Sequence, residues 1–118
     1  MKHTFTFPPK PNGDNAVEIS AFYQKGGMNW FNGKTESGGF YISFHTGCLK
    51  RDHWGESFTY MMFDGFKVKV ADGSRDNKKK CAALLERVTE EIALLAYEDN
   101  QKGCYDALKQ LFSPELAS

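Results

Sequence analysis

Apolar and polar residues alternate with a period of two through much of the first 70 residues, which is typical of β-strands with one buried face. The clearest segments span residues 16–23, 39–46, 57–63 and 66–70. In the second of these, Phe40, Ile42 and Phe44 fall on one face. Asp64-Gly65 joins the last two segments and is the strongest hairpin signal in the chain.

The stretch between the first two strands is rich in glycine and aromatic residues. Lys25-Gly26-Gly27 predicts a bend, and Asn32-Gly33 tolerates the positive φ angles of a tight hairpin turn. The sequence therefore predicts a hairpin here. The polar segment at residues 47–55 predicts a connection rather than a strand.

The period changes to three and four residues after residue 75, which indicates an amphipathic helix. Its apolar stripe runs from Cys81 to Ala96, and either Asp76 or Asn77 can cap its start. We predict one helix over residues 76–98, a break at residues 100–103, and a short second helix over residues 105–112.

These elements predict an α+β domain: an antiparallel sheet of about four strands packed against a long C-terminal helix and a short second helix. Residues 1–15 read as an N-terminal arm with a proline-rich linker, although Lys2–Phe7 also fits a short strand. Residues 16–118 form a single domain, with the sheet at 16–71 and the helices at 76–112. A chain of 118 residues is long enough to bury a core.

Composition places the chain among ordinary globular proteins, with 41% hydrophobic and 25% charged residues. The net charge is zero, but twelve Lys and Arg against eight Asp and Glu give residues 1–81 a charge of +4. Three cysteines at wide spacings favour free thiols and a cytoplasmic location. We expect no signal peptide, because the N-terminal residues begin no apolar segment of the kind that a signal peptide has. We also expect no membrane span, because the sequence has no run of about 18 apolar residues.

Two chemical motifs do not meet the requirements of the sites they resemble, the first because of its spacing and the second because of its number of ligands. Gly33-Lys34-Thr35 resembles the end of a phosphate-binding loop, but five residues separate Gly27 from Gly33 where that loop has four. His45, Cys48 and His53 could bind a metal, yet a structural zinc site needs a fourth ligand. We therefore predict no cofactor, and we assign no catalytic residue, so an enzyme ranks behind a binding protein.

The remaining signal is a basic segment beside a second aromatic face. The strands carry bulky residues on both faces, and one helical stripe covers only one face of a sheet. The candidate covers for the other face are the N-terminal arm with Phe5 and Phe7, a second copy in a homodimer, or a ligand. Stacked bases are such a ligand, because aromatic residues beside basic ones bind single strands. The candidate residues are Trp30, Tyr41, Trp54, Lys67, Lys69, Lys78, Lys79 and Lys80.

The element order over residues 17–95 resembles that of whirly and Pur-alpha-like single-stranded nucleic-acid-binding proteins. The resemblance implies aromatic and basic residues on the sheet and dimerisation through the helices. It rests on element order, since no family motif matches residue by residue. The second aromatic face beside excess positive charge leads us to expect a non-catalytic binding protein for single-stranded DNA or RNA, with no membrane association. We also expect it to form a homodimer. The alternative is a protein-interaction module, such as an adaptor or inhibitor from a mobile element, that uses the aromatic face.

Overall fold

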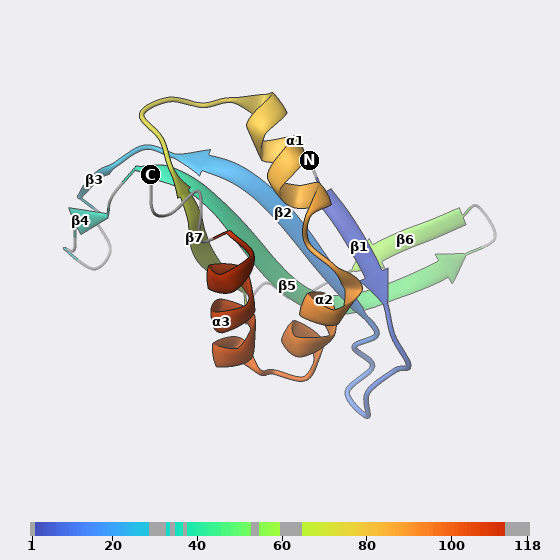
Figure 1. The fold of residues 1–118 in the computed structure, drawn as a ribbon. Helices are drawn as coiled ribbons and strands as arrows, with labels where there is room; N and C mark the ends of the chain where they lie inside the picture. Colours follow the sequence, from blue (N-terminus) through green and yellow to red (C-terminus); the bar gives the residue numbers. More distant parts are fainter. Residues whose placement is uncertain are drawn as a thin grey trace.

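The computed structural model describes the backbone of residues 2–28, 33, 35–36, 38–52, 55–59 and 65–112. The strands are β1 (Lys2–Thr6), β2 (Ala16–Gln24), β3 (Gly27–Met28), β4 (Thr35–Glu36), β5 (Gly39–Asp52), β6 (Gly55–Thr59) and β7 (Phe66–Asp72). The helices are α1 (Lys78–Glu86), α2 (Glu90–Tyr97) and α3 (Gln101–Leu111). An antiparallel sheet with helices on one side confirms the predicted α+β class (Figure 1).

The sheet is built around β5, which pairs with three other strands. β2 lies antiparallel to β5 over residues 39–47, and β7 pairs antiparallel with residues 39–44 of β5. β1 extends the sheet on the far side of β2, where Lys2 pairs with Ser20 and Thr6 with Ala16. The first segment of the chain is therefore a strand of this sheet.

The predicted hairpin at Asp64-Gly65 is wrong. β6 and β7 do not pair with each other; both pair with β5, at Cys48–Asp52 and Gly39–Phe44 respectively. The prediction of a connection at residues 47–55 is wrong for the same reason, since residues 47–52 continue β5. A strand of 14 residues offers enough backbone for both partners, whereas the polar composition of this segment suggested a loop. Residues 60–64 lie outside the described chain.

The glycine-rich stretch does form a small hairpin. β3 and β4 pair antiparallel, with Met28 opposite Thr35. Gly33 has a φ of 69°, the left-handed conformation that the Asn-Gly pair predicted.

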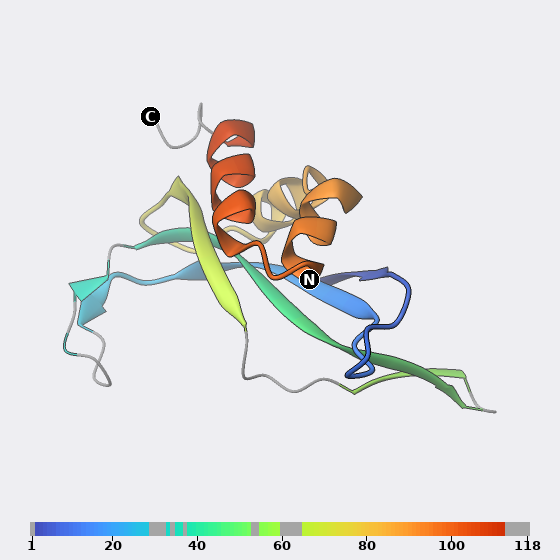
Figure 2. The same cartoon turned by 90° about the horizontal axis from the view of Figure 1, so that it is seen from below.

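All three helices pack on one face of the sheet, and the opposite face carries no helix among the described residues (Figure 2). Strand alternation places Ile19, Ile42 and Phe44 on the helix side, where each is at most 1% exposed. They join Leu85, Leu108 and other apolar residues of the helices in one core. No described helix is long and apolar enough to cross a membrane.

The region predicted as one helix contains two. α1 ends at Glu86, and the side chain of Thr89 then accepts a hydrogen bond from the backbone N–H of Ile92 to start α2. A threonine that caps the following turn competes with continuation of the preceding helix. The apolar stripe survives the break, because Leu84, Leu85, Val88 and Ile92 are all buried. The N-cap of α1 is Asn77, one of the two residues predicted from the sequence as possible caps of this helix.

The loop after β1 is fixed to α2 through Tyr97. The Tyr97 hydroxyl donates to the carbonyl oxygen of Pro8, and Phe7 stacks on the Tyr97 ring with a centroid distance of 4.8 Å. Phe5 pairs with Val17 and so lies on the helix side of the sheet. Of the three candidate covers for the second face, the arm with Phe5 and Phe7 is therefore wrong, since both residues pack against the core.

Candidate nucleic-acid interface

The sheet face opposite the helices is termed the open face. Alternation places on it the even-numbered residues of β2 and the odd-numbered residues of β5 and β7 up to residue 69. Away from β1 these residues are Phe22, Gln24, Tyr41, Ser43, His45, Lys67 and Lys69. The open face thus combines aromatic, polar and basic side chains on three neighbouring strands.

Two aromatic rings stack at the centre of this face. Phe22 and Tyr41 are paired across β2 and β5, with ring centroids 5.9 Å apart and an angle of 17° between the rings. The Lys67 Nζ lies 5.2 Å from the centroid of the Tyr41 ring and 2.5 Å from the Gln24 side-chain oxygen. Tyr41 is only 8% exposed, whereas Phe22 is half-buried. Phe22 is therefore the ring of this pair that a ligand can reach more readily.

A hollow of about 320 Å³ opens on this face beside Phe22. Its described lining residues are Phe22, Ser43, His45, Gly65, Phe66 and Lys67. Gly65 packs directly on His45, and a Cβ at position 65 would overlap with the imidazole ring. Glycine at this position therefore lets the start of β7 approach β5 closely. We call this hollow the face hollow.

A second hollow, of about 460 Å³, lies where the end of β2 meets the start of α1. Its described lining residues are Ala21, Phe22, Tyr23, Asp76, Lys78 and Cys81. We call it the edge groove. Phe22 lines both the face hollow and the edge groove, so it separates a site with Lys67 from a site with Lys78.

The structure brings together some of the predicted residues and leaves others apart. Lys67, Lys69 and Tyr41 lie on the open face, and Lys69 forms an ion pair with Asp72 at 2.6 Å. Lys78 reaches the edge groove. The Lys80 Nζ instead lies 5.0 Å from the ring centroid of Phe40, a residue of the helix side. Lys79 is exposed in the first turn of α1 but lines neither hollow, and Trp30 and Trp54 lie outside the described residues.

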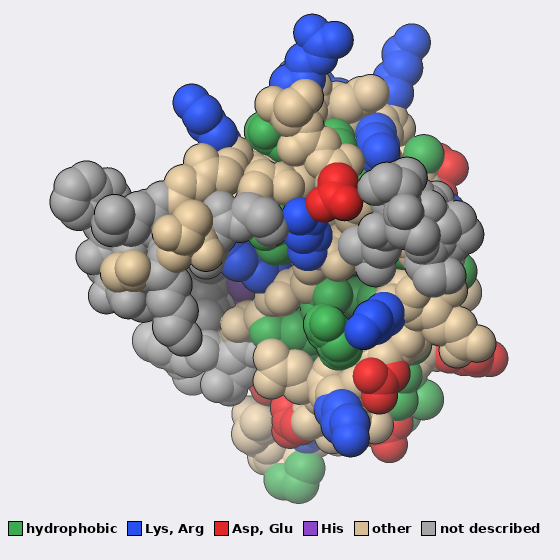
Figure 3. Space-filling view, turned by 60° about the vertical axis from the view of Figure 1, so that its left-hand side comes forward, with side chains coloured by type: hydrophobic (Ala, Val, Ile, Leu, Met, Phe, Trp, Pro, Cys, Tyr) green, Lys and Arg blue, Asp and Glu red, His purple; other side chains and the backbone are tan. Residues whose placement is uncertain are grey.

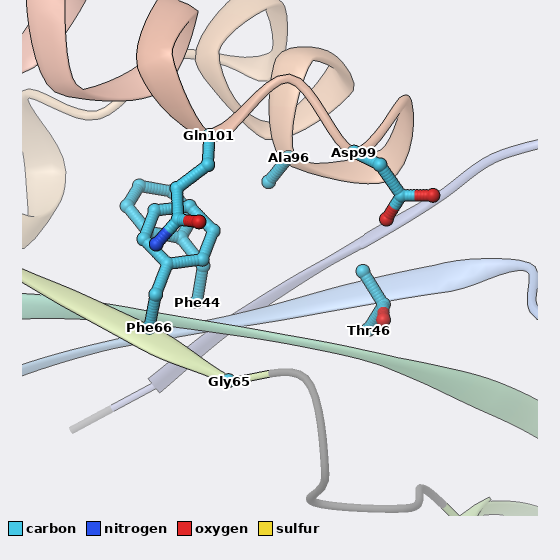
Figure 4. Close-up of a pocket in the computed structure, with 7 residues that line it drawn as sticks. All are labelled: Phe44, Thr46, Gly65, Phe66, Ala96, Asp99 and Gln101. Atoms are coloured by element: carbon cyan, nitrogen blue, oxygen red, sulfur yellow. The ribbon is translucent and has the colours of Figure 1, made fainter.

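A third hollow, of about 310 Å³, lies on the helix side of the sheet (Figure 4). Asp99 extends from the turn between α2 and α3, and Gln101 from the start of α3. The rings of Phe44 and Phe66 lie beside Gln101, and Thr46 lies across from Asp99. Asp99 is the only charged residue among the described lining residues. The Asp99 carboxylate forms an ion pair with the Lys10 Nζ at 3.6 Å. This hollow lies on the opposite side of the sheet from Tyr41, Lys67 and Lys69, so it is not part of the candidate interface.

Charge is distributed unevenly over the surface. Figure 3 shows Lys and Arg side chains gathered over the upper part of one side of the molecule, with a histidine beside basic side chains in a hollow. Acidic side chains lie mainly in the lower part of the same view. The first turn of α1 holds three lysines and no acid, whereas the first turn of α2 holds Glu90 and Glu91.

The thiols and His45 are spread over the described chain and do not converge on one place. Cys48, Cys81 and Cys104 are free thiols, as predicted, and burial raises the pKa of Cys104 to about 11. His45 and Cys48 are an odd number of residues apart on β5 and therefore point to opposite faces. No group of three potential metal ligands occurs among the described residues, which exclude His53.

Comparison with protein-family models, curated proteins and solved structures finds no match to this chain. The resemblance to whirly and Pur-alpha-like proteins therefore stays one of element order, and the candidate interface rests on the chain's own residues.

Sequence reasoning missed Phe22 as a site residue. The alternation that placed Val17, Ile19 and Ala21 in the core puts Phe22 on the opposite face, after Glu18 and Ser20. A lone aromatic residue at the end of an otherwise polar face was the available signal.

Proposed function

We propose that this protein binds single-stranded nucleic acid on the open face of its sheet, without catalysis. The single observation that carries the proposal is the position of Phe22. Phe22 is half-buried and lines both the face hollow, which contains Lys67, and the edge groove, which contains Lys78. A base stacked on Phe22 would place its flanking phosphates near one lysine on each side.

The arrangement around Phe22 also favours a ligand over a purely structural role. Tyr41 supports the Phe22 ring from one side, and Lys67 in turn lies over Tyr41. A stacked pair with an adjacent cation provides a preorganised platform, which lowers the entropy cost of ordering the site on binding.

The electrostatic part of the proposal predicts a change in salt dependence. Replacing Lys67 and Lys69 together by Gln should weaken binding of single-stranded DNA or RNA. The plot of log affinity against log salt should become shallower by about 1.4, since each lysine lost removes one phosphate contact worth about 0.7 on a single strand. Fluorescence anisotropy with a labelled oligonucleotide, measured at several salt concentrations, gives both quantities.

Lys102→Gln with Lys109→Gln provides the matched control, because both lysines are exposed on α3 in the helix layer. This control should leave affinity and salt slope close to those of the wild type. Equal effects of the two double variants would mean that net charge alone attracts the nucleic acid, and the open face would lose its assignment.

The proposed stacking of a base on Phe22 predicts that removing this ring weakens binding even when the salt concentration is raised. Phe22→Ala should weaken binding by about 1–3 kcal/mol, the range for one base–aromatic stack. The loss should persist at moderate salt, where phosphate contacts contribute less. Tyr105→Ala is the control, since Tyr105 is an aromatic residue of α3 with 48% exposure. Wild-type affinity in Phe22→Ala would contradict the proposed site.

The same titrations separate the proposal from its alternative. A protein-docking surface predicts no binding of oligonucleotides at micromolar concentration and a protein partner whose binding is insensitive to salt.

The homodimer expected from the sequence stays a prediction, and size-exclusion chromatography with light scattering measures the oligomeric state directly.

A further inference from the structure

The edge groove differs from the face hollow in its charge. It contains both an acid, Asp76, and a base, Lys78, whereas Lys67 is the only formally charged residue lining the face hollow in the described part of the chain. A site for phosphate alone has no use for a carboxylate. A ligand that presents both a hydrogen-bond donor and a negative charge would complement the two side chains of the edge groove.

The position of the groove leaves it open to a ligand. β1 pairs with β2 only over Ala16–Ser20, so the outer edge at Ala21–Tyr23 extends beyond the paired residues of β1. α1 begins beside this edge, and the walls of the groove are the apolar side chains of Ala21, Tyr23 and Cys81. Such walls suit a planar ring, which can lie between the strand edge and the helix.

Asp76 and Cys81 line the same groove, Asp76 as an exposed residue and Cys81 as a buried one. The pKa of the Cys81 thiol is raised first by burial and second by the negative charge of Asp76, in agreement with this shared lining. Within the described chain, neither Asp76 nor Lys78 has an ion-pair partner that would hold it elsewhere.

We infer that the edge groove selects a nucleobase with an exocyclic amino group, with Asp76 accepting its hydrogen bond and Lys78 contacting the adjacent phosphate. A carboxylate can only accept hydrogen bonds, and cytosine, adenine and guanine present an amino donor. Uracil presents a carbonyl oxygen where cytosine has its amino group, so Asp76 would repel it. This inference rests on the proposed function and adds base preference to it.

Oligo-dC and oligo-dU of about 12 nucleotides test the inference, since this length is within the range that small single-strand-binding domains cover. The two bases differ at the ring position where cytosine carries its amino group and in the protonation of the adjacent nitrogen. Fluorescence anisotropy at neutral pH and fixed salt should show oligo-dC binding about fivefold more tightly than oligo-dU to the wild-type protein.

Three variants make the result specific to the groove. In Asp76→Asn the two affinities should become equal to within about twofold, because a carboxamide can accept from cytosine and donate to uracil. Lys78→Gln should weaken both oligonucleotides alike and keep their ratio. Asp106→Asn removes the same charge from an exposed position of α3 and should keep the wild-type ratio.

The outcomes are distinct. Equal binding of oligo-dC and oligo-dU by the wild type, or a wild-type ratio in Asp76→Asn, would overturn the base preference and leave the proposed function standing. Absence of binding by either oligonucleotide at micromolar concentration would overturn the proposed function, and the base preference with it.

Discussion

Phe44→Ala should lower the free energy of unfolding by about 3–5 kcal/mol, a large part of the stability of a domain of this size. Phe44 is 1% exposed, and its ring stacks on Phe66 with a centroid distance of 5.1 Å. It pairs with Ile19 on β2 and with Phe66 on β7, so its loss leaves a cavity between three strands and the helices. Urea denaturation followed by circular dichroism measures the change.

Tyr105→Ala is the control for this experiment too, because it removes an aromatic ring from an exposed site. The Lys109 Nζ lies 5.7 Å from the centroid of the Tyr105 ring. The variant should cost less than about 1 kcal/mol. A Phe44→Ala variant as stable as Tyr105→Ala would mean that the core is not centred on β5.

Tyr97→Phe should cost about 1–2 kcal/mol, although it removes a single oxygen atom. Tyr97 is 9% exposed, and its hydroxyl donates to the carbonyl oxygen of Pro8. The variant keeps the ring and its stacking on Phe7, but it leaves that carbonyl without its donor. Urea denaturation gives the global change in stability.

Hydrogen exchange gives the local part of the Tyr97 effect. The backbone N–H of Phe7 donates to Asn15, and that of Lys10 donates to Asp14. Both amides should exchange faster in Tyr97→Phe, since the loop that carries them is fixed to α2 by the hydroxyl. Tyr105→Phe, at an exposed site, should change neither stability nor exchange. Unchanged protection in Tyr97→Phe would show that Phe7 stacking alone fixes the loop.

The sequence predicts the fold class because periodicity is a local property. The alternation at residues 16–23 and the helical stripe after residue 76 each identify an element without knowledge of its partners. Strand pairing is not local. Asp64-Gly65 fits a hairpin in isolation, but β7 pairs with β5 instead, and only the length of β5 explains that choice.

The candidate site shows the same division. Lys67 and Lys69 could be placed on one face of a strand, because positions two residues apart share a face. The sequence could not show which of Lys78, Lys79 and Lys80 reaches the candidate interface. The direction of each side chain depends on how α1 packs on β2. The meeting of Asp76 with the end of β2 joins residues more than fifty positions apart, and no sequence pattern encodes it.

Asn15 has a further consequence for self-association. Its side-chain amide donates to the carbonyl oxygen of Leu49 at 3.1 Å and accepts from the Leu49 N–H at 2.7 Å. These are the two backbone groups that an added strand would use. β5 continues past the end of β2 at this point, where an uncovered edge would template intermolecular sheet growth. The carboxamide of Asn15 thus occupies both backbone groups of Leu49, so an added strand could not pair with β5 at this residue without displacing Asn15.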